Sequence, residues 1–143
     1  MILGLGIDVI EVKRVEASLA RFPERFEKRV FTAAEREYCR ARKSKAAESF
    51  ALRWAAKEAV AKAMGTGIRG GVDFADIEVA ADRLGRPSIR LHGGAAAAAK
   101  KRGIETFHVS LTHEGDLAVA FAVAEGVTKA AAKPKRRARK AAR

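Results

Sequence analysis

One alanine-rich segment, residues 53–68, carries the residue types that phosphate chemistry needs. Its charged residues and its closing glycine turn are Arg53, Lys57, Glu58, Lys62 and Gly65-Thr66-Gly67. In a helix, charged residues four apart share one face. A carboxylate there can hold a divalent cation, while the neighbouring cations neutralise phosphoryl oxygens. The same spacing also suits solvated ion pairs on an exposed helix face, and the segment alone leaves both interpretations open.

The N-terminus is an apolar run that ends in an aspartate, and it predicts a short strand. Side chains alternate along a strand, so one face would carry Leu3, Leu5, Ile7 and Val9, and the other Ile2, Gly4, Gly6 and Asp8. Glycines beside an aspartate let another backbone or a ligand approach closely. Asp8 is therefore a candidate metal ligand, and equally a candidate cap for the helix that we expect to begin near Glu11.

The candidate metal ligands are hard oxygen donors. Asp8 and Glu58 favour Mg²⁺, which keeps several waters and completes its shell with substrate phosphates. The three histidines lack zinc-ligand spacing, so a zinc site is not expected. His113 falls where we predict the end of a strand, beside a turn. A histidine and neighbouring hydroxyl groups there can contact phosphate oxygens, although a turn histidine is more often simply exposed.

Three separated motifs resemble those of the holo-[acyl-carrier-protein] synthases, the small phosphopantetheinyl transferases. The motifs are Gly4-Leu5-Gly6-Ile7-Asp8, the run from Arg53 to Gly67, and Val109-Ser110-Leu111-Thr112-His113. They occur in the family's order, and the resemblance covers residues 1 to about 125. It implies an enzyme that transfers 4′-phosphopantetheine from coenzyme A to a serine of apo acyl-carrier protein. Adenosine 3′,5′-bisphosphate would be released, and the reaction would support fatty acid biosynthesis.

The resemblance also implies residue roles. Asp8 and Glu58 would hold Mg²⁺ against the pyrophosphate of coenzyme A, and with Lys62 they would form the catalytic group. The residues expected to bind coenzyme A are Arg53, Lys57, Lys62, Gly65, Thr66, Ser110 and His113. The proton of the attacking serine could pass to Glu58, to Asp8 or to water on the metal, and the sequence does not choose among them. Members of the family are typically trimers with the active site between neighbouring subunits.

A predicted helix from Glu11 to Phe22 is the candidate docking surface for the carrier protein. Arg14 and Arg21, seven residues apart, share a face away from the apolar positions. Such a pair is often only a solvated face. The resemblance favours docking of the acidic recognition helix of acyl-carrier protein, with Arg25 and Phe26, beyond Pro23, as further contacts.

The formal charge of +12 is unevenly distributed along the 143 residues. Residues 127–143 hold eight cationic side chains and no acidic one, which leaves +4 on residues 1–126. We therefore predict a transferase domain over 1–126 and a basic, disordered tail over 127–143. Such a tail can make weak nonspecific contact with nucleic acid or merely remain solvated.

Composition limits the other classes of function. No apolar stretch reaches the length of a membrane span, and the single cysteine, Cys39, excludes an internal disulfide. The N-terminus lacks the basic region of a signal peptide and Asp8 interrupts its apolar run, so we do not expect a signal peptide. We expect a cytoplasmic protein. A small basic nucleic-acid-binding module is the alternative from another class, although the body is nearly neutral and has few aromatic residues. A transferase that acts on a different carrier domain is the other alternative.

Helical and alternating patterns are mixed along the body. The expected helices are 11–22, 32–42, 46–64 and 95–102, and the expected strands are 1–8, 72–81, 87–91, 104–112 and 117–124. Thr32-Ala-Ala-Glu35 is a capping box, and glycine marks the end of the long helix. Together these patterns predict an α+β fold, with a small antiparallel sheet packed on a long central helix and shorter helices.

Overall fold

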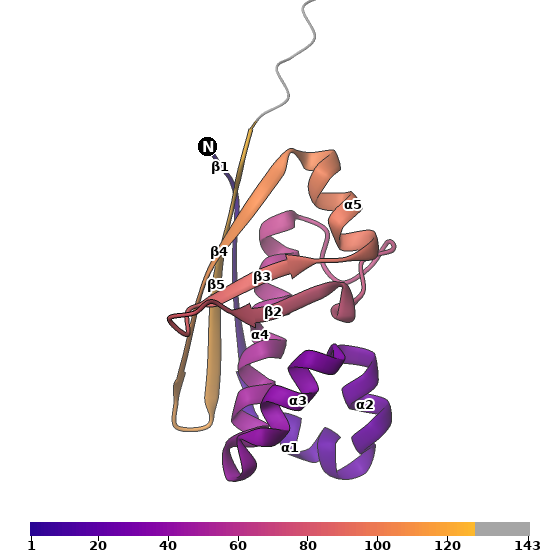
Figure 1. The fold of residues 1–143 in the computed structure, drawn as a ribbon, viewed down its shortest axis with the longest axis vertical. Helices are drawn as coiled ribbons and strands as arrows, with labels where there is room; N and C mark the ends of the chain where they lie inside the picture. The colour runs from indigo at the N-terminus through magenta and orange to yellow at the C-terminus, as the bar shows by residue number, and fades with distance from the viewer. Residues whose placement is uncertain (128–143) are drawn as a thin grey trace, which may run out of the picture.

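The computed structural model describes residues 1–127, and their fold is mixed α and β (Figure 1). A three-stranded antiparallel sheet has the order β1-β5-β4, and a separate hairpin pairs β2 with β3. The strands are β1 (Ile2–Glu11), β2 (Ile77–Ala81), β3 (Pro87–Leu91), β4 (Ile104–Glu114) and β5 (Leu117–Gly126). The predicted α+β class with a small antiparallel sheet is confirmed.

A long helix, α4, lies along the three-stranded sheet, and shorter helices lie at its two ends (Figure 1). The helices are α1 (Val12–Arg21), α2 (Pro23–Val30), α3 (Ala33–Ala41), α4 (Ala46–Met64) and α5 (Gly93–Arg102), with 3₁₀ turns η1 (Lys43–Lys45) and η2 (Phe74–Asp76). Helices α1, α2 and α3 gather at one end of the molecule and α5 lies at the other. No helix among the described residues is long and apolar enough to cross a membrane.

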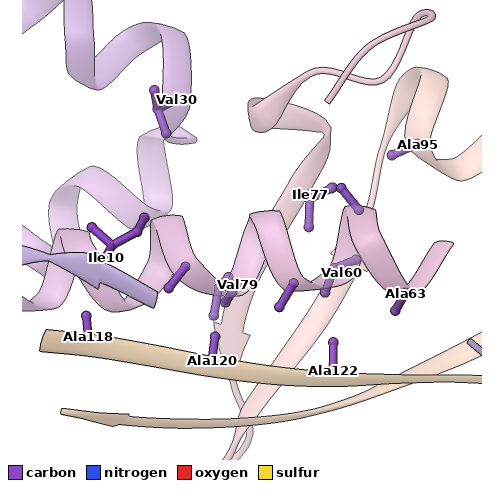
Figure 2. Packing of buried hydrophobic residues seen from close by; sticks show 14 of the residues in the cluster. Ile10, Val30, Val60, Ala63, Ile77, Val79, Ala95, Ala118, Ala120 and Ala122 are labelled. Atoms are coloured by element: carbon purple, nitrogen blue, oxygen red, sulfur yellow. The ribbon is translucent and has the colours of Figure 1, made fainter. Parts of the chain in front are cut away.

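Small residues let α4 lie unusually close to the sheet. A methyl group added at Gly4 would lie 1.9 Å from the carbonyl oxygen of Ala63, and one added at Gly6 would lie 1.9 Å from that of Ala59. Strand β5 presents only alanines to the helix, namely Ala118, Ala120, Ala122 and Ala124, all fully buried (Figure 2). The glycine face of β1 therefore admits another backbone, as the sequence predicts.

The opposite face of the sheet is apolar and exposed. Leu5, Ile7 and Val9 are 59%, 57% and 53% exposed, and Phe121 of β5 is 42% exposed. In the antiparallel register Ile7 lies opposite Phe121, so these side chains share one surface. We call the exposed side chains Leu5, Ile7, Val9, Leu117 and Phe121 the outer apolar face.

The structure adds one helix and corrects two boundaries. The helix predicted over 11–22 ends at Arg21, before Pro23. Pro23 then begins α2, which the sequence reasoning missed, at the first turn, where the missing N–H of proline costs nothing. The strand expected from Val72 begins only at Ile77, because η2 precedes it. His113 lies inside β4 rather than at a turn, since the strand continues to Glu114 and β5 begins at Leu117.

Other local predictions are confirmed. Thr32 and Glu35 form both hydrogen bonds of the capping box that begins α3. Gly65 ends α4 in the left-handed conformation, with φ of 77°. Cys39 is fully buried, and burial raises the pKa of its thiol, so it is a packing residue. Most of the segment predicted to be a disordered tail lies outside the described residues.

Candidate active site

Asp8 and Lys62 meet where β1 crosses α4. The ammonium of Lys62 donates to Asp8 Oδ1 at 2.9 Å and to the carbonyl oxygen of Ile7 at 2.9 Å. The Asp8 side chain is 16% exposed and that of Lys62 is 51% exposed. Asp8 does not cap α1, because that helix has Glu11 at its N-cap and no side-chain cap. The carboxylate is thus held at the surface by a cation rather than used by the helix.

Glu58 lies in the same place. A hollow of about 170 Å³ is lined by Asp8, Val9, Ile10, Arg14, Trp54 and Glu58. Burial raises the pKa of Glu58, the charge of Asp8 raises it further, and Lys62 and Trp54 act in the opposite direction. Two carboxylates that repel each other in one hollow are what a bound cation would relieve. We call Asp8, Glu58 and Lys62 the carboxylate site.

The raised pKa of Glu58 can be tested by an experiment that needs no substrate. Its carboxyl group should titrate at a higher pH than an ordinary glutamate, so the anion that a metal needs is lost earlier as the pH falls. Asp8→Asn should lower this pKa, since it removes one of the charges that raises it. Carbon-13 NMR titration of the metal-free protein measures both values. An Asp8→Asn variant with an unchanged Glu58 pKa would mean that the two groups do not interact.

The structure places Lys57 in the core and not in this site. Its side chain is 0% exposed, and its three N–H donors reach Glu35 Oε1 at 2.7 Å, the Phe74 carbonyl at 3.0 Å and the Ile77 carbonyl at 2.5 Å. An ammonium group has three donors, so none remains for a phosphate. The prediction that Lys57 binds coenzyme A is therefore corrected to a structural role, because the inner face of α4 packs on α3 and β2.

Arg53 lines a different and larger cavity. Its guanidinium lies 4.0 Å from the centre of the Tyr38 ring and donates to Ser49 Oγ at 3.2 Å. The cavity has a volume of about 580 Å³, and other cations and hydroxyl groups on its wall are Arg42, Lys45, Ser49, Arg86, Ser88, His108 and Ser110. The sequence reasoning missed Arg42, Lys45 and Arg86, since they come from the α3–α4 connection and from the β2–β3 turn and share no motif. This positive cavity suits a phosphate-bearing ligand.

Ser110 and His113 lie on β4, away from the carboxylate site. His113 Nε2 is 3.4 Å from Glu48 Oε1, and Glu48 lines the same cavity as Arg53. Strands β1 and β4 are the two edges of the sheet, with β5 between them. Two strand spacings separate the edges by roughly 10 Å. Within one chain, Ser110 and His113 therefore do not share a site with Asp8.

Gly65 and Thr66 follow Lys62 at the C-terminal end of α4. They line a third hollow, of about 620 Å³, whose cations are Arg69, Lys101 and Arg102. Thr66 Oγ1 donates to the carbonyl oxygen of Ala61 at 3.5 Å, within the turn that ends the helix. The glycine turn thus follows Lys62 of the carboxylate site at the C-terminal end of α4, whereas Arg53 precedes that site along the helix.

The predicted docking surface is exposed, with one exception. Arg14, Arg21 and Arg25 are exposed, and Arg14 also lines the hollow of the carboxylate site. Phe26 is half-buried, with its ring 5.3 Å from that of Trp54, so most of it belongs to the body. Phe22, which is 51% exposed under the Arg21 guanidinium, is the free aromatic ring of this surface and was not predicted.

The sequence profile of the 4′-phosphopantetheinyl transferase superfamily matches residues 4–122. The chain belongs to this superfamily. The match spans both edge strands, α4 and the carboxylate site. The resemblance drawn from the three motifs is confirmed, and so is the expectation that the protein is a transferase enzyme.

Individual relatives agree along their whole length. The chain is 48% identical over 125 residues to the holo-[acyl-carrier-protein] synthase of Koribacter versatilis, covering 87% of this chain and 99% of the relative. It matches the crystal structure of the Neisseria meningitidis synthase at a TM-score of 0.79 and 37% identity, covering 87% and 99% of the two chains. The Bacillus anthracis synthase, solved in complex with CoA (3′,5′-ADP), matches at a TM-score of 0.74 and 38% identity, covering 89% and 99%.

Proposed function

We propose that this protein transfers the 4′-phosphopantetheine group of coenzyme A to a serine of apo acyl-carrier protein and releases adenosine 3′,5′-bisphosphate. The observation that carries the proposal is the carboxylate site, where Asp8, Glu58 and Lys62 meet beside the exposed arginines of α1. The complexes of relatives with coenzyme A support the same substrate.

The donor set fits Mg²⁺. Asp8 and Glu58 offer two carboxylates, and no group of three or more metal-ligating side chains occurs among residues 1–127. Two protein ligands suit a small cation that completes its shell with water and phosphate oxygens. When bound, Mg²⁺ would supply positive charge against the pyrophosphate of coenzyme A.

The chain's own residues supply orientation and charge. Lys62, with half its side chain in solvent, is free to move its ammonium from Asp8 to a phosphoryl oxygen and to neutralise charge in the transition state. The pKa of Glu58 is raised, which brings it closer to the pKa that suits a general base for the attacking serine. Arg14 belongs to the docking helix α1 and also lines the hollow that contains Asp8 and Glu58, so the docking surface adjoins the carboxylate site.

We further propose that the nucleotide of coenzyme A occupies the positive cavity of Arg53 in a neighbouring subunit of a trimer. The predicted residues Ser110 and His113 lie on the far edge of the sheet from Asp8, so one subunit does not complete the site. The outer apolar face supports assembly, because it is a contiguous apolar surface of a kind that usually marks an interface.

Mass spectrometry of apo acyl-carrier protein tests the proposal. Incubation with coenzyme A and Mg²⁺ should add the mass of one 4′-phosphopantetheine group, and a serine-to-alanine carrier protein should remain unmodified. Parallel reactions with other carrier domains test whether the enzyme acts on a different one. No mass increase on any carrier domain would contradict the proposed activity. We also propose a role in fatty acid biosynthesis and a cytoplasmic location, on the ground that the proposed substrate is an acyl-carrier protein.

The docking surface gives a prediction about affinity. Arg14→Glu with Arg21→Glu should raise the apparent KM for carrier protein strongly and leave that for coenzyme A almost unchanged, since an acidic helix would then meet like charges. Each exposed pair contributes only about 0.2 to 1 kcal/mol, so both reversals are needed. The wild-type reaction should slow as salt screens the charges. Equal increases in both KM values, or insensitivity to salt, would place the dock elsewhere.

The basic tail gives a prediction about polyanions. We propose that the tail, residues 127–143, makes weak nonspecific contact with nucleic acid, because it carries eight cations and no acidic side chain. Truncation after Val127 keeps the hydrogen bond from its N–H to the Gly103 carbonyl. The melting temperature and turnover should stay unchanged, while DNA binding measured by fluorescence anisotropy weakens. Unchanged DNA binding, or a large loss of stability, would contradict this proposal.

A further inference from the structure

A buried ion pair joins four elements behind the carboxylate site. Lys57 of α4 and Glu35 of α3 are 0% and 1% exposed, and their charged atoms lie 2.7 Å apart. Glu35 Oε1 also accepts from the Thr32 N–H at 2.9 Å, and Oε2 accepts from the Val79 N–H of β2 at 3.0 Å. Every polar atom of the pair is therefore used inside the protein, and the pair is a junction of α3, α4, η2 and β2.

The remaining donors of Lys57 hold the η2 turn. They reach the carbonyl oxygens of Phe74 at 3.0 Å and of Ile77 at 2.5 Å, at the start and just beyond the end of η2. Burial lowers the pKa of Lys57, and the charge of Glu35 opposes that change. Among residues 1–127, Glu35 is the one carboxylate in contact with the buried Lys57 ammonium, so the hold on η2 depends on both residues.

The η2 turn is one wall of a cavity that Glu58 shares. This cavity, of about 570 Å³, is lined by Arg29, Glu58, Ile68, Asp73, Phe74, Ala75 and Asp76. The Phe74 ring also packs edge-on against Trp54, at 6.0 Å between centroids, and Trp54 lines the smaller hollow between Asp8 and Glu58. A shift of η2 therefore changes the surroundings of Glu58 on two sides.

We infer that Lys57 and Glu35 are positioning residues: they fix the η2 turn against α4 and so set the surroundings of Glu58. This inference rests on the proposed function of Glu58, which touches the reacting groups. Neither Lys57 nor Glu35 touches substrate. Neighbouring residues of α4 thereby have different roles: Glu58 and Lys62 belong to the carboxylate site, and Lys57 fixes the turn beside it.

The test separates positioning from stability. Lys57→Met leaves the Glu35 charge buried without a partner and should lower the melting temperature by roughly 10 °C or more. The double variant Lys57→Met with Glu35→Gln carries no charge at this junction, and the oxygen of its new amide can still accept from the Thr32 or Val79 N–H. Its melting temperature should therefore recover most of the loss, while the Phe74 and Ile77 carbonyls still lack the hydrogen bonds that Lys57 donates.

If the pair positions η2, kcat of the double variant stays at least about tenfold below wild type, on the scale of a small misplacement of catalytic groups, and KM for coenzyme A stays nearly unchanged. The emission of Trp54, the single tryptophan, should shift as Phe74 moves. Return of kcat to the wild-type value together with stability would overturn the inference. A low kcat with unchanged Trp54 emission would also overturn it.

A matched control uses an ion pair that is exposed on both sides. Lys28 Nζ lies 3.7 Å from Glu24 Oε2 on α2, and the two side chains are 64% and 81% exposed. Lys28→Met with Glu24→Gln should leave kcat and Trp54 emission unchanged. If the wild-type protein itself has no transferase activity, the proposed function is wrong, and this outcome is distinct from failure of the positioning inference. In that case Trp54 emission and hydrogen exchange of η2 in the double variant still test the positioning.

Discussion

Asp8→Asn and Glu58→Gln should each reduce turnover by about a hundredfold or more, the scale of losing a major electrostatic element. Each substitution keeps the volume of the side chain but removes one of two carboxylates from the hollow that we assign to Mg²⁺. Magnesium tolerates the loss of a charged ligand poorly, because it demands a regular shell of hard oxygen donors. Steady-state transfer of phosphopantetheine at a fixed Mg²⁺ concentration measures the effect.

Glu11→Gln is the matched control for this experiment. Glu11 is an exposed carboxylate on the same strand as Asp8, and its side chain makes no cap to α1. Its turnover should equal that of the wild type. Circular dichroism should show that all three variants are folded. Near-normal turnover of Asp8→Asn or of Glu58→Gln would remove that residue from the metal site.

Mixing two inactive subunits should restore activity if the site is shared between subunits. Asp8→Asn damages the carboxylate site, and His113→Ala damages the opposite edge of the sheet, where His113 meets Glu48. We expect each variant alone to be slow. Co-expression lets a subunit with intact Asp8 face a neighbour with intact His113, so turnover should rise well above that of either variant.

The outer apolar face provides the control for the mixing experiment. Ile7→Glu together with Phe121→Glu places two charges in one cross-strand pair on that face, which should prevent assembly. The mixture should then gain nothing, and light scattering should report monomers. A mixture that stays as slow as its components, although light scattering reports trimers, would show that His113 and Asp8 do not complete one site.

Local sequence patterns predicted the elements well because they are set by neighbouring residues. The capping box at Thr32, the glycine that ends α4 and the alternation in β1 each act over a few residues, and each appears in the structure. The carboxylate site was also within reach of the sequence. Asp8 ends an apolar alternation, and Glu58 and Lys62 keep helical spacing, so each has a predictable face.

Only the tertiary structure decided what each face meets. Lys57 and Glu58 are neighbours in sequence, yet Lys57 points at Glu35 from α3, while Glu58 opens to the hollow with Asp8. Helical spacing does not show which side of a helix is covered, and an alanine-rich helix carries no apolar stripe that would indicate it. Leu5, Ile7 and Val9 of β1 likewise point outward, because two glycines bring α4 against the other face.

The separation of Asp8 from His113 depends on strand order, which no local pattern contains. The sequence placed both residues at strand positions, but pairing put β5 between their strands. Pairing is chosen by contacts between residues more than a hundred positions apart, such as Gly6 opposite Ala122. The residues that we assign to the chemistry could be named from the sequence, whereas the separation of Asp8 and His113 onto opposite edges of the sheet follows from how distant segments pack.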